Sequence, residues 1–150
     1  MVSTKGRYAL RVIIDLVQQG KDGYVPLREI AERQEISPKY LEAIVSLLHK
    51  NGLVVGLRGK GGGYRLAKKP SEYTVGSILK LTEGTLAPVT CLECDTRSYC
   101  SRSDECLTLP MWKQLDSLID GYLESVTVED LVNEGLGDQI ILPLTGGKVE

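Results

Sequence analysis

All four cysteines of this chain lie within sixteen consecutive residues. Cys91, Cys94, Cys100 and Cys106 follow the spacing C-x2-C-x5-C-x5-C. A thiolate is a soft ligand that suits an iron–sulfur cluster, zinc or Cu(I), and it can also be oxidised reversibly. The residues between the cysteines are mostly polar, so this loop could not pack well without a bound ion. The spacing therefore predicts a cofactor site or a redox site.

The same spacing favours an iron–sulfur cluster over structural zinc. A structural zinc site usually takes its ligands from two close cysteine pairs, but this chain has a single C-x2-C pair and two gaps of five residues. Zinc and a thiol switch without a cofactor stay open as alternatives. His49, the single histidine, falls near the end of a predicted helix far before the cysteines, and we interpret it as a surface side chain.

Length and composition indicate a cytoplasmic protein with a proper core. The chain has 150 residues, of which 42% are hydrophobic, so it does not need disulfides for stability. Its start, "MVSTKGRYAL", lacks the apolar run of a signal peptide, and no segment approaches the roughly 18 apolar residues of a membrane span. No convergent set of catalytic side chains is visible, and we expect no enzyme.

The two halves of the chain carry opposite charge. Residues 1–70 contain 13 Lys and Arg against 6 Asp and Glu, whereas residues 71–150 contain 5 against 14. A basic half is what a nucleic-acid-binding protein needs, because contacts with phosphates dominate affinity. A chance excess of charge on solvated faces explains the asymmetry equally well, so charge alone does not decide between the two.

The first half shows the pattern of a helix-turn-helix. Apolar residues recur at three- and four-residue steps over residues 4–19, and a second, short helix is predicted for residues 27–34. Ser37 is a good N-cap for a third helix, Pro38 fits its first position, and Asn51-Gly52 ends it. In this motif the N-terminal residues of the last helix enter the major groove of DNA.

A basic wing is predicted directly after this helix. "LVVGLR" and "YRLAKK" read as two strands, joined by the loop "GKGGG". Glycines such as Gly61 let the loop bend sharply and bring its backbone close to a partner. Arg58 and Lys60 are placed to reach phosphates or the minor groove. A nucleotide-binding loop is excluded, because no Lys-Ser/Thr pair opens a helix after these glycines.

The second half reads as helices around the cysteine loop. Thr74 caps a short helix, residues 109–126 form a long helix with a broad apolar face, and Thr127 caps a last short helix. Because helix-turn-helix proteins usually bind DNA as two-fold dimers, we interpret the long helix as a dimerisation helix. We therefore predict a mainly α fold with a small β wing. Its predicted parts are a DNA-binding domain (1–73), a cluster-binding and dimerisation region (74–135) and a flexible tail (136–150).

Five segments carry a resemblance to a known family. They are "STKGRYAL", "ISPKYLEAIVSLLHKNGLV", "RGKGGGYRLAK", "CSRSDECLT" and "SVTVEDLV", which follow one another over about residues 1–133. Together they resemble the winged-helix regulators related to IscR, NsrR and CymR. The resemblance implies a dimeric, DNA-binding repressor or activator, in which the cysteine loop of one subunit lies near the DNA-binding domain of the other. It places Lys39, Glu42 and Arg58 against DNA.

The resemblance also implies part of a ligand set. Cluster-binding members of the family have three cysteines at C-x5-C-x5-C, a pattern that Cys94, Cys100 and Cys106 match. Similarity to IscR favours a [2Fe–2S] cluster, while four cysteines would equally suit [4Fe–4S].

The fourth ligand is where the chain departs from its family. The histidine of IscR corresponds to Leu109, and the N-terminal acidic ligand of NsrR-like members falls near Arg7 and Tyr8. Cys91 is our candidate for this ligand, and Glu93 and Asp95 are alternatives.

The sequence thus predicts a homodimeric transcription regulator whose binding to an operator in double-stranded DNA is controlled by an iron–sulfur cluster. The same regulator with a zinc or thiol switch is one alternative. A small iron–sulfur electron-transfer protein is another, which the basic wing and the capped helix disfavour. The predicted DNA contacts are Ser37, Lys39, Tyr40, Glu42, Arg58, Lys60 and Gly61.

Overall fold

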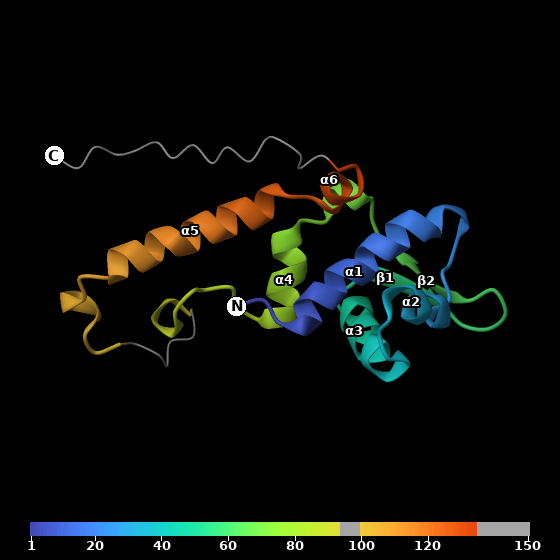
Figure 1. Cartoon of the computed structure of the whole chain (residues 1–150), viewed down its shortest axis with the longest axis horizontal. Helices are drawn as coiled ribbons and strands as arrows, with labels where there is room; N and C mark the ends of the chain where they lie inside the picture. The colour runs from blue at the N-terminus through green and yellow to red at the C-terminus, as the bar shows by residue number, and fades with distance from the viewer. Residues whose placement is uncertain (94–99, 135–150) are drawn as a thin grey trace.

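The computed structural model describes residues 1–93 and 100–134, so Cys94, Asp95 and the predicted tail 136–150 lie outside the described residues (Figure 1). Besides four short 3₁₀ helices, six α-helices and one hairpin make up the regular structure of this described part. They are α1 (Thr4–Gln19), α2 (Leu27–Gln34), α3 (Pro38–Lys50), β1 (Val54–Leu57), β2 (Gly63–Leu66), α4 (Val75–Glu83), α5 (Leu109–Ser125) and α6 (Val128–Val132). The prediction of a mainly α fold with a small β wing is confirmed.

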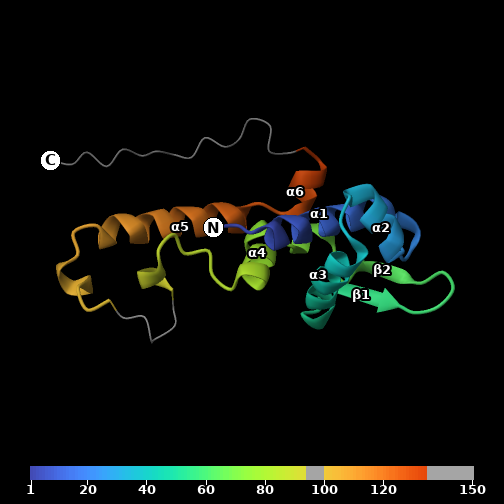
Figure 2. The ribbon, with the colours of Figure 1, turned by 60° about the horizontal axis from the view of Figure 1, so that its bottom comes forward.

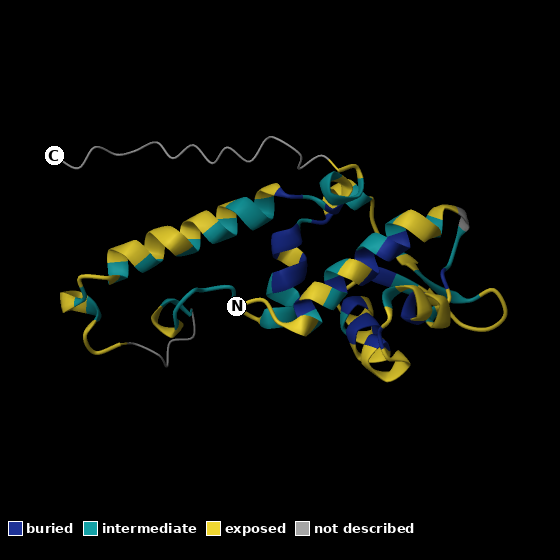
Figure 3. Cartoon of the chain, in the orientation of Figure 1, coloured by how far each residue is buried: buried dark blue, intermediate teal, exposed yellow. Residues whose placement is uncertain are grey.

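One apolar core holds the winged helix together. Ile13 of α1, Ile30 of α2 and Leu41 of α3 are completely buried in it. Ile78 of α4 and Val128 of α6 belong to the same core, so these two helices pack onto the helix-turn-helix rather than apart from it. Figure 3 shows this as buried stretches that run through α1, α3 and α4. The core fixes α3 by its apolar stripe and leaves the opposite face free.

A buried carboxylate fixes the turn of the helix-turn-helix. Asp15 on α1 is only 2% exposed. Arg33 donates to both of its oxygens at 3.0 and 2.8 Å, and Gln34 donates to it at 2.8 Å. The next residue, Glu35, adopts the left-handed conformation that ends α2. Because a buried charge must be paired, this network holds the end of α2 against α1 and sets where α3 begins.

The wing is an antiparallel pair with a tight approach at its base. Val54 pairs with Leu66, and Leu57 pairs with Gly63. Val25 adds an isolated bridge to Tyr64 on the outer side of β2. Gly63 has a φ of 148°, and a Cβ at this position would collide with the carbonyl oxygen of Val25. Glycine is therefore required where the wing meets the segment before α2.

The long helix α5 leaves this core and extends along the molecule (Figure 1). None of its 17 residues is buried. Its C-terminal end is attached where Val75 donates its backbone N–H to Val126, at 2.8 Å, and Val128 donates to Tyr73, at 2.9 Å. A small second core of Val75, Leu79 and Val126 lies beside these bonds. The helix is thus fixed at one end only within the described residues.

Candidate functional site

The first half of α3 presents a polar face to solvent. Lys39, Tyr40 and Glu42, three of the predicted DNA contacts, are exposed there. The hydroxyl of Ser37 accepts a hydrogen bond from the backbone N–H of Tyr40 at 3.4 Å, so it caps the helix. The ring of Tyr40 meets the edge of Tyr8, with ring centroids 5.9 Å apart. This contact with α1 supports the end of α3 that a major groove would receive.

The wing carries the second group of predicted contacts. Arg58, Lys60 and Gly61 are exposed in the loop between β1 and β2. Gly61 has a φ of 75°, a conformation that favours glycine and lets the loop turn back. Figure 2 shows α3 and the wing at the same end of the molecule, remote from the cysteine loop. The structure therefore brings the two predicted sets of DNA contacts onto one end of the fold.

His49 lies against an aromatic side chain of the wing. Its ring lies edge-on to Tyr64 of β2, with centroids 6.4 Å apart. The contact connects the end of α3 to the wing. The interpretation of His49 as a surface side chain at a helix end agrees with its exposure.

At the other end of the molecule, two cysteines share a pocket. Cys91 and Cys100 line a pocket of about 350 Å³, and both are exposed. Leu109 and Lys113, from the first turns of α5, line the same pocket. Ser103 and Asp104 complete its wall. The side chain at position 109 thus lies where it could face both thiols, and being a leucine it offers no donor atom.

Cys106 lies beside the start of α5. Its sulfur is 3.4 Å from the hydroxyl oxygen of Thr108, and either atom can be the donor. The hydroxyl and backbone N–H of Thr108, together with the N–H of Leu109 and the charge of Arg102, lower the pKa of the Cys106 thiol. A lowered pKa favours the thiolate, which is the form that binds metals and reacts. Across residues 1–93 and 100–134, no three Cys, His, Asp or Glu side chains are gathered as a metal site.

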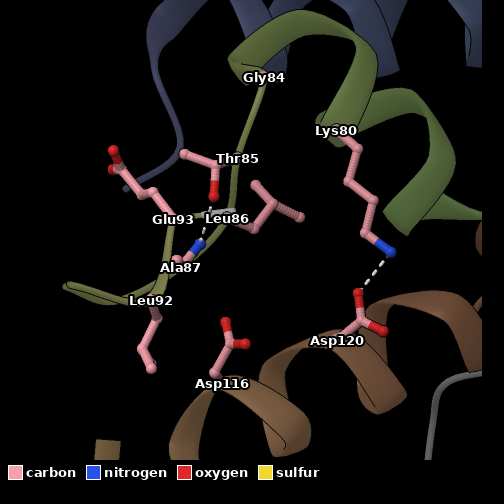
Figure 4. A pocket seen from close by; sticks show the side chains of 9 residues that line it. All are labelled: Lys80, Gly84, Thr85, Leu86, Ala87, Leu92, Glu93, Asp116 and Asp120. Atoms are coloured by element: carbon pink, nitrogen blue, oxygen red, sulfur yellow. Dashed lines mark hydrogen bonds and ion pairs between the residues drawn. The ribbon is translucent and has the colours of Figure 1, made fainter. Parts of the chain in front are cut away.

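A second cleft, which the sequence did not reveal, separates α5 from the segment that follows α4. It measures about 480 Å³ and is shown in Figure 4. Glu93, Asp116 and Asp120 give it an acidic lining, and Leu92 adds an apolar one. Glu93, the alternative ligand, therefore lines this cleft and not the pocket of Cys91.

An ion-pair network closes one side of this cleft. Lys80 of α4 pairs with Asp120 and, at 2.8 Å, with Glu124 of α5. These contacts raise the pKa of Lys80, and Lys80 together with Thr74 lowers the pKa of Glu124. The paired residues are some forty positions apart in sequence. No local periodicity could have predicted them.

Comparison with known proteins assigns the winged helix and the cysteine loop to a single protein family. The model of the Rrf2 family, described as an iron-dependent transcriptional regulator, matches residues 2–134. The chain belongs to the Rrf2 family. This Rrf2 regulator therefore combines the winged helix and the cysteine loop within one family match, and the predicted function of a transcription regulator is confirmed at this level. No helix in the described part of the chain is long and apolar enough to cross a membrane.

Individual relatives give the same result. The HTH-type transcriptional regulator IscR of Serratia proteamaculans is 41% identical over 132 residues, which cover 88% of this chain and 79% of the relative. Among solved structures, T. potens IscR aligns with a TM-score of 0.71 at 36% identity, covering 90% of this chain and 88% of that one. CymR, the global cysteine regulator of B. subtilis, aligns with a TM-score of 0.72 at 35% identity, covering 89% and 97%.

Proposed function

We propose that two copies of this chain form a dimer that binds a two-part DNA operator in the cytoplasm, and that an iron–sulfur cluster in the cysteine loop controls this binding. The family match and the IscR relatives support the regulatory role. The division into a DNA-binding part (1–73), a cluster and dimerisation part (74–135) and a tail (136–150) belongs to the same proposal.

For DNA recognition, the proposal rests on the exposed end of α3 and the wing. Lys39 and Glu42 would lie in the major groove, where a carboxylate can accept a hydrogen bond from cytosine N4. Arg58 would reach the minor groove beside the wing and the phosphates that border it, and Lys60 would contact phosphates. Three uncharged residues would also lie against the DNA. Ser37 and Gly61 would do so through their backbone, and Tyr40 through its ring.

For the dimer, the proposal rests on the exposed apolar stripe of α5. Met111, Leu115 and Leu118 are 51%, 38% and 49% exposed, and their spacing places them on one face of the helix. A helix with no buried residue gains little from its own chain, because most helical stability in proteins comes from packing an apolar face. A second copy of α5 would cover this stripe in a two-fold arrangement.

For the cofactor, the observation that carries the proposal is the shared pocket of Cys91 and Cys100. Thiol donors fit an iron–sulfur cluster, and the thiolate-favouring surroundings of Cys106 fit it as well. Cys91, Cys94, Cys100 and Cys106 would hold it, with [2Fe–2S] as the first expectation and [4Fe–4S] as the second. The bound cluster would supply a one-electron redox centre that oxidants can destroy.

A second candidate is the same regulator with a zinc or thiol switch. The lowered pKa of the Cys106 thiol favours it, since such a thiol is reactive when no metal is bound. Both candidates keep the DNA-binding surface unchanged. They differ in what the cysteine loop contains.

One anaerobic preparation tests the proposal. The protein is purified or reconstituted without oxygen, its visible spectrum is recorded, and iron, sulfide and zinc are assayed per chain. About two irons and two sulfides per chain support [2Fe–2S], and about four of each support [4Fe–4S]. DNA binding is then compared before and after cluster removal. Colourless protein after reconstitution, or equal DNA binding in both states, contradicts control by a cluster.

A further inference from the structure

Two kinds of contact form the joint between α4 and α5. Apolar contacts form its non-directional part, and hydrogen bonds and ion pairs form its directional part. The apolar part, Val75, Leu79 and Val126, packs against Tyr122 and Leu123 near the end of α5. The directional part starts at the same end and reaches slightly further along the helix, to Asp120. Glu124 accepts hydrogen bonds from the hydroxyl of Thr74, at 2.7 Å, and from Lys80, at 2.8 Å. Lys80 reaches on to Asp120, one turn nearer the cysteine loop (Figure 4).

The two helices approach closely at this point. A Cβ added to Gly76 would lie 2.7 Å from a carboxylate oxygen of Glu124 and 3.1 Å from its backbone nitrogen. Glycine therefore lets the backbone of α5 meet the first turn of α4. The apolar contacts have no preferred direction. The backbone bond between Val75 and Val126 lies beyond the last residue of α5, so it holds the end point of the helix and leaves the tilt of the helix to side-chain contacts. The hydrogen bonds of Lys80 and Glu124 define one angle.

A small change of this angle has a large effect at the far end of the helix. The 17 residues of α5 span about 25 Å at roughly 1.5 Å per residue. A tilt of about 10° would move the far end by about 4 Å, which exceeds the rise of one base pair, about 3.4 Å. In a dimer joined through α5, the same tilt would move each recognition helix relative to the other.

We propose that Lys80, Asp120 and Glu124 act as positioning residues that fix the angle of α5 and thereby select the spacing between the two half-sites of the operator. This inference rests on the dimeric, DNA-binding function proposed above. Leu92 and Glu93, which follow Cys91, line the same cleft as Lys80 and Asp120. The joint therefore adjoins the cysteine loop and lies between it and the winged helix.

The test compares spacing preference in full-length protein. A duplex is selected from a random DNA pool by the wild-type protein, and versions with one base pair inserted or deleted at its centre are prepared. The wild-type protein should prefer the selected spacing by about tenfold or more. Lys80→Met and Glu124→Met should each reduce this preference to about threefold or less, because the hydrogen bonds that fix the angle are lost. Lys80→Arg should keep it, since a guanidinium can still reach both carboxylates.

Matched controls separate the possible results. Glu32→Gln removes an exposed ion pair within α2, far from the joint, and should leave the spacing preference intact. Sedimentation and circular dichroism establish that each variant is folded and dimeric, and Glu124→Met serves if Lys80→Met does not fold. A folded variant that keeps the wild-type preference, or that loses affinity equally at every spacing, overturns the inference. Wild-type protein that selects no duplex contradicts the proposed function instead.

Discussion

Cys91 and Leu109 face the same pocket, and exchanging their roles tests the ligand set. Cys91→Ser should reduce the iron retained after reconstitution to about half or less, because one thiolate is lost. Adding Leu109→His should restore the cluster and raise its reduction potential, since an imidazole replaces a negatively charged thiolate. Iron and sulfide assays and a redox titration followed by electron paramagnetic resonance measure both effects.

The matched control for this pair is Ser103→Ala, which changes the wall of the same pocket without removing a thiol. Its iron content should equal that of the wild-type protein. If Cys91→Ser also keeps full iron and an unchanged potential, Cys91 is not a ligand. Another donor would then complete the site.

Arg58 offers a test of the wing at the same scale. Arg58→Ala should weaken DNA binding by about 1 kcal/mol, roughly fivefold, and lower the slope of log K against log salt by about one, because one phosphate contact is lost. Titrations at several salt concentrations measure the slope. Lys21→Ala removes a cation outside the predicted surface and should change neither value. An unchanged slope in Arg58→Ala would remove this residue from the phosphate contacts.

At the scale of elements, α4 is held at both ends. Its start is joined to α5, and its last residue, Glu83, is joined to the beginning of α1. The backbone N–H and the hydroxyl of Ser3 donate to one oxygen of Glu83, at 3.0 and 2.7 Å. These bonds, that of the hydroxyl above all, lower the pKa of Glu83. The cysteine loop leaves α4 directly after this contact, so the loop begins from a fixed point.

The lowered pKa gives this contact a defined pH dependence. A carboxylate whose pKa is lower in the folded chain stabilises the fold fully above its unfolded pKa, near 4.5, and this contribution is lost as the pH falls through the lower folded value. Glu83→Gln should therefore lower the free energy of unfolding by roughly 1 kcal/mol at pH 7. The difference from wild type should shrink as the pH falls below 4.5 and through the lower folded pKa of Glu83.

Urea denaturation at a series of pH values and one fixed protein concentration measures this difference. Glu129→Gln, which changes an exposed carboxylate on α6, is the control and should have little effect. A stability loss in Glu83→Gln that stays constant down to pH 3 would mean that the contact acts through shape and not through charge.

Local signals in the sequence were enough to predict the elements. Ser37, Thr74 and Thr127 are helix caps as predicted, because each accepts a hydrogen bond from an N–H three residues later. The ends were less exact, since both strands are shorter than predicted. These differences follow from fraying, which no propensity resolves.

The contacts between elements could not be predicted in the same way. The pairing of Asp15 with Arg33, the bond between Ser3 and Glu83 and the joint of Lys80 with Glu124 each connect residues far apart in the chain. A charged residue on a helix looks the same in sequence whether it faces water or a partner. The candidate ligands were found by spacing alone, and the placement of Cys91 with Cys100 required the fold.

At the scale of the whole molecule, the apolar stripe of α5 predicts that the chain works in pairs. Replacing Leu115 and Leu118 together by glutamate should weaken dimerisation by about 100-fold or more, because two charges would be buried against an apolar face. Analytical ultracentrifugation measures the dissociation constant. DNA binding should fall with it, since two half-sites need two subunits.

Ser117→Glu adds a charge at an exposed position of the same helix outside the stripe and serves as the control. It should leave the dimer intact. If the double variant stays dimeric at micromolar concentration, the stripe is not the interface, and another surface must join the subunits.

The helix α5 also affects how the amount of such a protein would be controlled inside a cell. Only the C-terminal end of this 17-residue helix packs against the described part of its own chain, so the rest of the helix has little to hold it closed against local opening. An unpaired copy would therefore expose α5 to proteases, whereas a paired copy would shield it. Surplus single chains would be degraded and pairs would persist, so the supply of competent regulator would rise more steeply than its rate of synthesis.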